Sequence, residues 1–305
     1  MNLCIYRMIF KTAHFGEGKL SESAKTFSSN RLYSALLIEA IQQGCLEDFL
    51  QYTHSDEFIL SDGFPYESEP YLPKPIGFPL HKAPYNNSLS EIRLTRRDSK
   101  MSKKIQFIKA SYLTDFINDA EHLEDFLQEE QSNALLCEHT RKGIDPYQIG
   151  ISNYSSKSLY VIAPSSGLVK QLMLGLQYSG FGGKRTSGLG SFQLITEKID
   201  NELSSILSNQ RGSYYMTLSN CIPNTDTTPD ITKGAKYRLR KNSGFAFSNV
   251  VTEQLRKQDT YSFQSGSVFR RTFTGCIKDV APEGYAHPVL FYAKPFWIKM
   301  EVNHD

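Results

Sequence analysis

Apolar residues repeat with a period of two in several short stretches of the first part of the chain. Alternate positions in residues 3–11 are apolar, which predicts a strand with one apolar face made of Cys4, Tyr6, Met8 and Phe10. The run from Leu159 to Ala163 is apolar throughout and predicts a second, buried strand. A third strand is predicted to begin at Phe192.

Two other stretches carry apolar residues at helical spacing. The first follows Asn30, a good N-cap residue, and its apolar stripe consists of Leu32, Leu36, Leu37, Ala40 and Ile41. The second follows Ser166 as N-cap, and its stripe consists of Leu168, Val169, Leu172, Met173 and Leu176. Both stretches are predicted to be amphipathic helices that pack on the strands.

With further strands expected between these helices, the element order is β-α-β-β-α-β, the split unit of ferredoxin-like domains. We therefore predict an α+β protein whose first domain spans residues 1–205. Residues 206–305 form a second, β-rich domain, because four stretches alternate or are rich in β-branched and aromatic residues. These stretches are Tyr214–Leu218, Lys236–Arg240, Val268–Phe273 and Phe296–Val302.

A glycine-rich loop, residues 180–190, separates the second helix from the third strand. It holds five glycines together with Lys184, Arg185, Thr186 and Ser187. Glycine permits positive φ and a close approach of backbone N–H groups, and successive N–H groups beside cations form a concave anion site. The composition suits a phosphate backbone. A flexible surface loop is the alternative that these residues leave open.

The common nucleotide-binding motifs do not fit this loop. A P-loop needs Ser or Thr after Gly-Lys, but Gly183-Lys184 is followed by Arg185. The dinucleotide fingerprint needs a glycine at position 185 as well. Both motifs also run strand, loop, helix, whereas the order here is helix, loop, strand. Small nucleotides are therefore disfavoured as ligands.

The helix, the loop of pattern Gly-Phe-Gly-Gly-Lys-Arg-x-Ser-Gly-x-Gly and the following strand resemble the RAMP proteins of CRISPR systems. Other segments sharpen the resemblance to the subunit family of the type III-A Csm complex that caps the 5′ handle of the crRNA. These segments are residues 10–18, 27–35, 71–77, 174–184, 242–248 and 256–261. The resemblance thus extends from the first predicted strand into the second domain.

The resemblance implies two ferredoxin-like, RRM-like domains, the second degenerate, with a β-hairpin thumb projecting from the first at about residues 78–108. It implies a non-catalytic subunit that anchors the crRNA 5′ handle in antiviral defence against foreign RNA and DNA. The implied partners are the crRNA, the target RNA held by the guide, the large polymerase-domain subunit and the backbone RAMP subunit. Nuclease and cyclic-oligoadenylate synthase activities are expected in other subunits.

The alternative function is a metal-independent endoribonuclease that processes precursor crRNA. Such cleavage needs a general base for the 2′-hydroxyl and an acid for the leaving oxygen. His14, which follows the first strand, is the residue that could supply one of them. Histidines at strand ends more often pack or contact RNA, so we predict an RNA-binding role for His14 and no catalysis.

We expect RNA to contact the loops after the first strand and the second helix, a basic stretch, and a basic pair near the end of the chain. In the basic stretch, six cations between Arg93 and Lys104 face one acid, Asp98, which attracts phosphates but is also typical of a solvated face. The predicted RNA-binding residues are His14, Phe15, Gly16, Lys19, Arg31, Gly180, Gly182, Gly183, Lys184, Arg185, Thr186, Ser187, Gly188, Gly190, Arg93, Arg96, Arg97, Arg256 and Lys257. Phe245 and Phe247 are expected to be core strand residues.

Composition sets limits on these expectations. The formal net charge of the 305 residues is +2, so any nucleic-acid surface must be local. Five scattered cysteines without a CxxC pair, and histidines without a partner at helical ligand spacing, favour no metal and no cofactor. No apolar run approaches the length of a membrane span, and Arg7 and Lys11 come too early for a signal peptide, so a soluble cytoplasmic protein is expected.

Overall fold

The computed structural model describes residues 2–79, 89–118, 134–139, 147–154, 157–224, 228–246, 248, 251 and 255–303. Its centre is a six-stranded sheet with the order β5-β4-β3-β8-β1-β9, in which every neighbouring pair is antiparallel. The strands are β1 (Leu3–Phe10), β3 (Phe64–Glu67), β4 (Glu69–Pro73), β5 (Phe107–Lys109), β8 (Ser158–Pro164) and β9 (Phe192–Lys198).

The predicted β-α-β-β-α-β connectivity is present in the first part of the chain. The order along the chain is β1, α1 (Ser29–Gln42), β3, β8, α5 (Gly167–Ser179) and β9, with β4 and β5 extending one edge of the sheet. The strands of the unit lie in the spatial order fourth, first, third, second. A further helix, α2 (Leu46–His54), follows α1.

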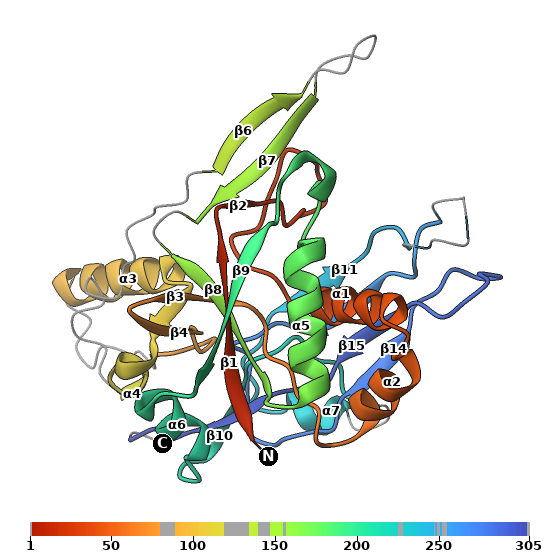
Figure 1. Cartoon of the computed structure of the whole chain (residues 1–305). Coiled ribbons are helices and arrows are strands. Elements are labelled where there is room, and N and C mark those ends of the chain that lie inside the picture. Colours follow the sequence, from red (N-terminus) through yellow and green to blue (C-terminus); the bar gives the residue numbers. More distant parts are fainter. Residues whose placement is uncertain are drawn as a thin grey trace.

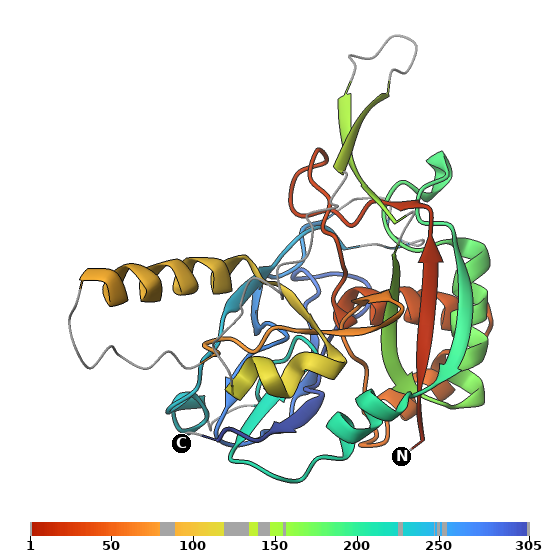
Figure 2. The ribbon, with the colours of Figure 1, turned by 90° about the vertical axis from the view of Figure 1, so that its left-hand side faces the viewer.

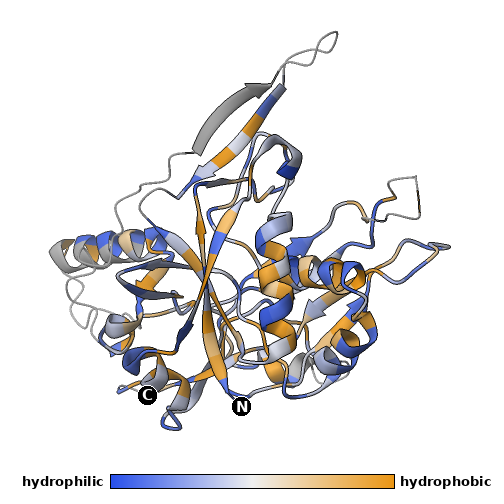
Figure 3. Ribbon diagram, viewed as in Figure 1, coloured by the Kyte–Doolittle hydropathy of each residue, from blue (hydrophilic) through white to orange (hydrophobic). Residues whose placement is uncertain are grey.

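Strand β1 is buried along one face and partly buried along the other. Cys4, Tyr6, Met8 and Phe10 belong to one core, as predicted, and α1 and α5 cover this face. Ile5 points to the opposite face and packs in a second core with residues of the second half of the chain, such as Met216 and Ile298. Figure 2 shows α5 on one side of β1 and β9 and the strands of the second half on the other. In Figure 3 hydrophobic colour is present on the central strands and on the helices that pack against them.

The two helices begin close to the predicted positions, but their caps differ. Ser166 caps α5 as predicted, because its hydroxyl accepts from the Val169 backbone N–H at 3.2 Å. Helix α1 begins at Ser29, and the predicted cap Asn30 lies inside it. A carboxylate from a distant part of the chain replaces a local cap: Asp62 Oδ1 accepts from the Ser29 N–H at 2.7 Å.

The predicted β-hairpin at residues 78–108 is wrong, because α3 (Leu89–Lys104) occupies most of this segment and β5 ends it. The cations of the segment recur every three or four residues, which suits a helix and not the two-residue repeat of a strand. Figure 2 shows α3 extending away from the sheet. Elements η1 (Ala110–Tyr112) and α4 (Leu113–Asn118) come after β5. The acidic residues of 119–130 alternate with apolar ones, which predicts an amphipathic helix, but this segment lies outside the described residues.

A hairpin does project from the body, but from a later segment. Strands β6 (Ala134–His139) and β7 (Tyr147–Asn153) pair antiparallel and rise above the sheet in Figure 1. At its base, β7 pairs with the short strand β2 (Thr12–Ala13). Gly150 N–H donates to the Leu20 carbonyl at 2.9 Å, so the hairpin is attached to the loop that follows β2.

The second half of the chain is β-rich, as predicted. Three smaller sheets are present: β13-β10-β16, β11-β12 and β14-β15. Their strands are β10 (Tyr214–Thr217), β11 (Leu239–Asn242), β12 (Thr260–Phe263), β13 (Val268–Phe269), β14 (Cys276–Asp279), β15 (Leu290–Ala293) and β16 (Trp297–Met300). The remaining described helical elements lie in both parts of the chain. They are η3 (Arg185–Ser187) in the glycine-rich loop, α6 (Asn201–Ser208) and α7 (Thr228–Thr232).

Some details of this half differ from the predictions. Of the stretch Lys236–Arg240, Lys236 makes an isolated bridge and a regular strand begins only at Leu239. Phe245 is 65% exposed, so its assignment to the core is wrong, and Phe247 lies outside the described residues. The predicted end of the first domain, residue 205, falls inside α6. Among the described residues, no helix is both long enough and apolar enough to span a membrane.

Candidate nucleic-acid interface

The loop after β1 and the glycine-rich loop are in direct contact. Gly183 N–H donates to the His14 carbonyl, and Gly190 N–H donates to the Thr12 carbonyl, both at 2.9 Å. The loop after β1 and the glycine-rich loop are neighbours because β1 and β9 are paired along their length. They form one rim beside the base of the β6–β7 hairpin.

The glycines of the rim permit close packing of backbone on backbone and on His14. Gly190 has φ +78°, and a Cβ there would lie 2.1 Å from the Phe181 carbonyl oxygen. A Cβ on Gly183 would lie 2.8 Å from the His14 ring. These two positions have no space for a side chain, so this part of the loop is packed against the rest of the protein.

Several N–H groups of this loop do not form the predicted anion cradle. Those of Phe181, Gly183, Ser187, Gly188 and Gly190 all donate to carbonyl groups of the protein. The hypothesis of a backbone cradle over residues 182–190 is therefore wrong at Gly183, Gly188 and Gly190. The hydrogen bonds that close the loop use the donors that a phosphate would need.

The cationic side chains of the loop remain accessible. Arg185, Thr186, Ser187 and Gly188 are exposed at its tip. Arg185 Nη1 donates to the carbonyls of Ser179 and Gly180 at 3.3 Å, which leaves other guanidinium N–H groups for an incoming ligand. Lys184 has the left-handed φ of 58°, and its ammonium lies 5.1 Å from the centre of the Tyr147 ring. The loop thus offers side-chain cations and hydroxyls in place of backbone donors.

His14 and Phe15 lie beneath this surface. His14 is 6% exposed, and its Nδ1 donates to the Gly150 carbonyl at 2.7 Å. Phe15 is fully buried in an aromatic cluster with Phe10, Phe27 and Phe181. The prediction that Phe15 contacts RNA is therefore wrong in this conformation, because no face of its ring can stack on a base. His14 joins the hairpin base to the rim.

On the rest of the first-strand loop, Gly16 and Lys19 have separate roles. Lys19 is exposed and forms an ion pair with Glu22 at 3.3 Å. The Gly16 carbonyl accepts from Arg31 Nη2 at 2.8 Å. Arg31 thus connects the first turn of α1 to the rim.

Arg31 lies near two cations of the second half, one of which was predicted. Burial is the main cause that lowers the pKa of Arg31 to about 10; the charge of Arg240 acts in the same direction, and Glu17 acts in the opposite direction. Burial also lowers the pKa of Lys257, and Arg31 adds to that effect. Arg256 is exposed and donates to Asp259 Oδ1 at 3.4 Å. Sequence reasoning missed Arg240, since no local pattern relates it to Arg31.

The predicted cations of the basic stretch share one face of α3. Arg93, Arg96 and Arg97 are exposed, as are the further cations Lys100, Lys103 and Lys104. Steps of three and four residues place these side chains on one side of the helix, over a length of about 16 Å from first to last. This cationic face is suited to phosphates along a nucleic-acid strand.

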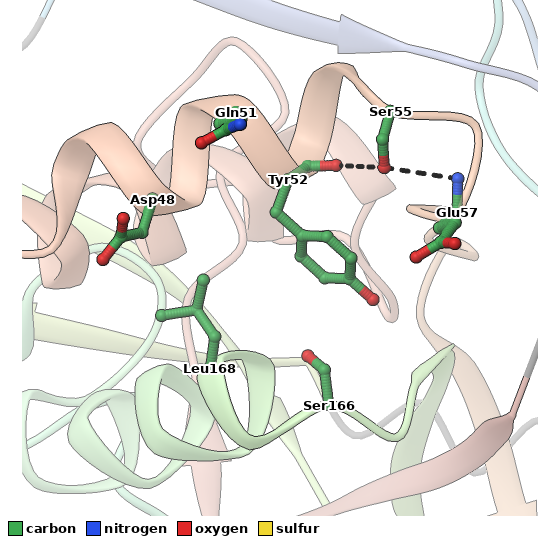
Figure 4. Close-up of a pocket in the computed structure, with 7 residues that line it drawn as sticks. All are labelled: Asp48, Gln51, Tyr52, Ser55, Glu57, Ser166 and Leu168. Atoms are coloured by element: carbon green, nitrogen blue, oxygen red, sulfur yellow. Dashed lines mark hydrogen bonds between the residues drawn. The ribbon is translucent and has the colours of Figure 1, made fainter.

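No metal site accompanies these surfaces: within the described residues, no group of three His, Cys, Asp or Glu side chains is placed to hold an ion. An open cleft of about 460 Å³ lies between α2 and the start of α5 (Figure 4). Its lining includes the carboxylates of Asp48 and Glu57 and no lysine or arginine. The glycine-rich loop begins at the other end of α5, about 20 Å away along this helix. The cleft is therefore not part of the cationic surface.

Comparisons with known proteins identify relatives over the full length of the chain. A family model described as the CRISPR Csm4 C-terminal domain matches residues 210–300. A CRISPR system protein Csm4 of Streptococcus thermophilus is 41% identical over 305 residues, covering 99% of this chain and 100% of that protein. Another, from Mycobacterium tuberculosis (strain ATCC 25618 / H37Rv), is 32% identical and covers 98% of each chain.

Solved structures share the fold at low sequence identity. One chain in the crystal structure of a Csm3-Csm4 subcomplex of the type III-A CRISPR-Cas interference complex aligns with a TM-score of 0.65 and 18% identity, covering 98% of this chain and 99% of that one. A chain in the crystal structure of a Csm1-Csm4 cassette with pppApA aligns with a TM-score of 0.62 and 15% identity, covering 100% of both.

Proposed function

The chain belongs to the Csm4 family of type III-A CRISPR complexes, and on that premise we propose that it is a non-catalytic subunit that anchors the 5′ handle of the crRNA. The observation that carries the proposal is the full-length likeness to Csm4 proteins, with 41% identity in one case. The exposed cations of the rim and of α3 indicate where the RNA would bind.

The proposal extends to the partners and the domains. Relatives have been solved as a Csm3-Csm4 subcomplex and as a Csm1-Csm4 cassette, which supports a large polymerase-domain subunit and a backbone RAMP subunit as neighbours of this chain. Within the complex, the bound guide would present target RNA. We also propose that the first half is a ferredoxin-like domain and the second a degenerate one, with the boundary after α6. Nuclease and synthase activities would belong to other subunits.

The predicted RNA-binding residues divide into two groups in this proposal. One group contacts RNA directly through exposed or half-buried polar side chains and the tip of the glycine-rich loop. Its members are Lys19, Arg31, Arg93, Arg96, Arg97, Lys184, Arg185, Thr186, Ser187, Gly188, Arg256 and Lys257. The other group shapes the rim from beneath and consists of His14, Phe15, Gly16, Gly180, Gly182, Gly183 and Gly190.

The binding of single-stranded RNA by such side chains has a measurable electrostatic component. Each phosphate contact that is lost should lower the slope of log K against log salt by about 0.7. Replacing both Lys184 and Arg185 by alanine should therefore weaken retention of the guide and lower the slope by about 1.4. A matched control is Lys233→Ala with Lys278→Ala, two exposed lysines of the second half.

The test is the RNA that co-purifies with the assembled complex. Sequencing should find one common 5′ end across many guides, and the Lys184/Arg185 variant should lose guide RNA as salt is raised while the lysine control does not. Random cellular RNA in the wild-type complex would contradict recognition of the handle. Equal retention by variant and control at several salt concentrations would contradict the role of the rim cations.

A further inference from the structure

We propose that the exposed face of the β11–β12 ribbon binds single-stranded RNA, with the rings of Phe245 and Tyr261 as stacking surfaces for bases. The proposal rests on the proposed function for the identity of the ligand as RNA. It adds a further RNA surface to the rim and α3, in a part of the chain where only Arg256 and Lys257 were predicted to bind RNA. Its basis is a row of exposed apolar, aromatic and cationic side chains on one side of the ribbon.

The first strand of the ribbon and its continuation have one exposed side. Exposure alternates along residues 239–245: the exposed residues are Leu239, Lys241, Ser243 and Phe245, and the residues between them are half-buried. Because side chains of a strand alternate between its two faces, the four exposed residues share one face. Leu239 is 56% exposed and Phe245 is 65% exposed. This face therefore offers apolar surface to a ligand.

The second strand adds an aromatic ring and two charged side chains to this face. Tyr261, which is 58% exposed, pairs with Lys241, and Phe245 pairs with Arg256 in an isolated bridge. Each ring therefore belongs to a residue directly opposite a cation. Asp259 forms ion pairs with Lys241 at 2.7 Å and with Arg256 at 3.4 Å. Exposed ion pairs contribute little to stability, so both cations can turn from Asp259 to a phosphate.

The opposite face holds the ribbon against the body of the protein. Ser262 is 1% exposed and Thr260 is 5% exposed, and Asn242 Nδ2 donates to Ser262 Oγ at 2.9 Å. At the end of the ribbon, the Phe263 ring lies 5.1 Å from that of Phe269 in a small buried cluster. The exposed rings are therefore carried by a supported sheet, which lowers the entropy that a ligand must overcome on binding.

The charge of this segment favours an anionic ligand. Between residues 236 and 252 there are four cations and no acid, whereas the whole chain has a net charge of only +2. Tyr261 lies opposite residue 241 and Phe245 lies four residues further along the same strand, so the two rings are about 13 Å apart, a spacing that suits separate bases. Exposed rings beside cations are the combination that binds single-stranded nucleic acids. RNA therefore fits this face better than an apolar protein surface does.

Direct contacts connect the ribbon to the cationic helix α3. Lys236, just before β11, donates from Nζ to the Gly77 carbonyl at 3.2 Å. Lys74, from the same segment as Gly77, donates from Nζ to Ser102 Oγ in the last turn of α3 at 3.2 Å. Burial lowers the pKa of Lys74 to about 8, and the charge of Arg238 acts in the same direction. The cations of α3 and those of the ribbon thus belong to neighbouring parts of the surface.

The experiment measures binding of a fluorescent single-stranded RNA of about ten nucleotides to the full-length chain. Tyr261→Ala and Phe245→Ala should each weaken binding roughly tenfold, because a stacking surface is lost. Tyr261→Phe should bind as the wild type does, since the ring remains. The matched control is Ile41→Ala, at an apolar side chain that is 54% exposed at the end of α1, and it should not change binding.

A second measurement concerns charge. Arg238→Gln, at an exposed residue next to β11, should lower the slope of log K against log salt by about 0.7. Lys278→Gln, at an exposed lysine of β14, should leave the slope unchanged. Equal RNA affinity of the wild type and both alanine variants would overturn the site, and equal weakening by Tyr261→Phe and Tyr261→Ala would overturn base stacking.

The assembled complex separates the remaining outcomes. If Tyr261→Ala released a partner subunit while the chain alone kept its RNA affinity, the ribbon would be a protein interface and the proposal would be wrong. Random cellular RNA in the wild-type complex, together with the expected losses in the chain alone, would contradict anchoring of the 5′ handle and leave the ribbon standing as an RNA-binding face.

Discussion

At the scale of single residues, Asp62 makes an unusual connection between the two halves. Its Oδ1 accepts from Ser29 N–H at 2.7 Å and from Asn220 N–H at 3.1 Å, so one buried oxygen satisfies donors from α1 and from the second half. Burial raises the pKa of Asp62, although both of these hydrogen bonds act in the opposite direction. The residue therefore joins the two halves at a buried position that disfavours the charged form of its carboxyl group.

Two substitutions separate these effects at Asp62. Asp62→Ala leaves two buried N–H groups without an acceptor and should lower the free energy of unfolding by about 2–4 kcal/mol. Asp62→Asn keeps an acceptor oxygen for these N–H groups and should lower the free energy of unfolding by less. Because the native pKa is raised, the native chain holds more protons than the unfolded chain between about pH 4 and the native pKa. In that window the stability of the wild type should fall relative to Asp62→Asn as pH rises.

Urea unfolding of the wild type and both variants over a range of pH measures this dependence. If the free energies of unfolding of the wild type and Asp62→Asn differed by the same amount at every pH, Asp62 would not titrate with a raised pKa. An alanine variant as stable as the wild type would show that Ser29 and Asn220 find other acceptors.

His14 is a second residue with a defined structural role. It is buried, and its Nδ1 donates to Gly150, so His14→Ala should lower the free energy of unfolding by about 2 kcal/mol through a lost hydrogen bond and a cavity. Processing of precursor crRNA and cleavage of target RNA by the assembled complex should remain, because the ring is occupied in packing. Loss of precursor cleavage with intact RNA binding would instead favour the endoribonuclease alternative.

At the scale of elements, the glycine-rich loop contains an internal comparison. Gly188 and Gly190 have nearly equal φ values, +83° and +78°. A Cβ at Gly188 meets nothing within 4 Å, whereas one at Gly190 would lie 2.1 Å from the Phe181 carbonyl oxygen. At both positions the backbone conformation would strain an alanine residue, but the two positions differ in the space around them.

Gly188→Ala should cost about 1 kcal/mol from its positive φ alone. Gly190→Ala adds a clash with rigid backbone and should cost several kcal/mol more, because either the loop or β9 must move. Thermal unfolding of both variants gives the difference directly, and RNA retention should fall further for Gly190→Ala than for Gly188→Ala. Equal melting temperatures would mean that the loop adapts without cost and that its packing does not define the rim.

Elements were predicted correctly where apolar residues repeat with the period of a strand or a helix. They were predicted poorly where charged residues carry the repeat. Strand β1 and helix α5 with its Ser166 cap carry their signal in neighbouring residues. Helix α3 was missed because its cations, not its apolar residues, carry the helical period. The cap of α1 could not be predicted, since Asp62 is distant in the chain. The prediction of a backbone cradle was wrong for a similar reason. The carbonyl groups that accept from Gly183 and Gly190 belong to His14 and Thr12, which are distant in the sequence.

At the scale of the molecule, one sheet serves two cores. The face with Tyr6 and Met8 packs against α1 and α5, whereas the face with Ile5 and Ile162 packs against strands of the second half. Tyr292 of the second half also enters the first core. The halves are thus interlocked, although their secondary structures differ.

This arrangement predicts that the first half cannot fold alone. A fragment of residues 1–208 retains α6 but exposes the sheet face that Met216 and Ile298 cover in the whole chain. Exposed apolar area of this kind should leave the fragment without cooperative thermal unfolding and able to bind a hydrophobic dye. Co-expression with residues 209–305 should restore a single transition and abolish dye binding, since the second half supplies the missing side of the core. A fragment that unfolds alone in one sharp transition, with the melting temperature of the whole chain, would show that the second half is an appended domain and that its contacts with the sheet contribute nothing to folding.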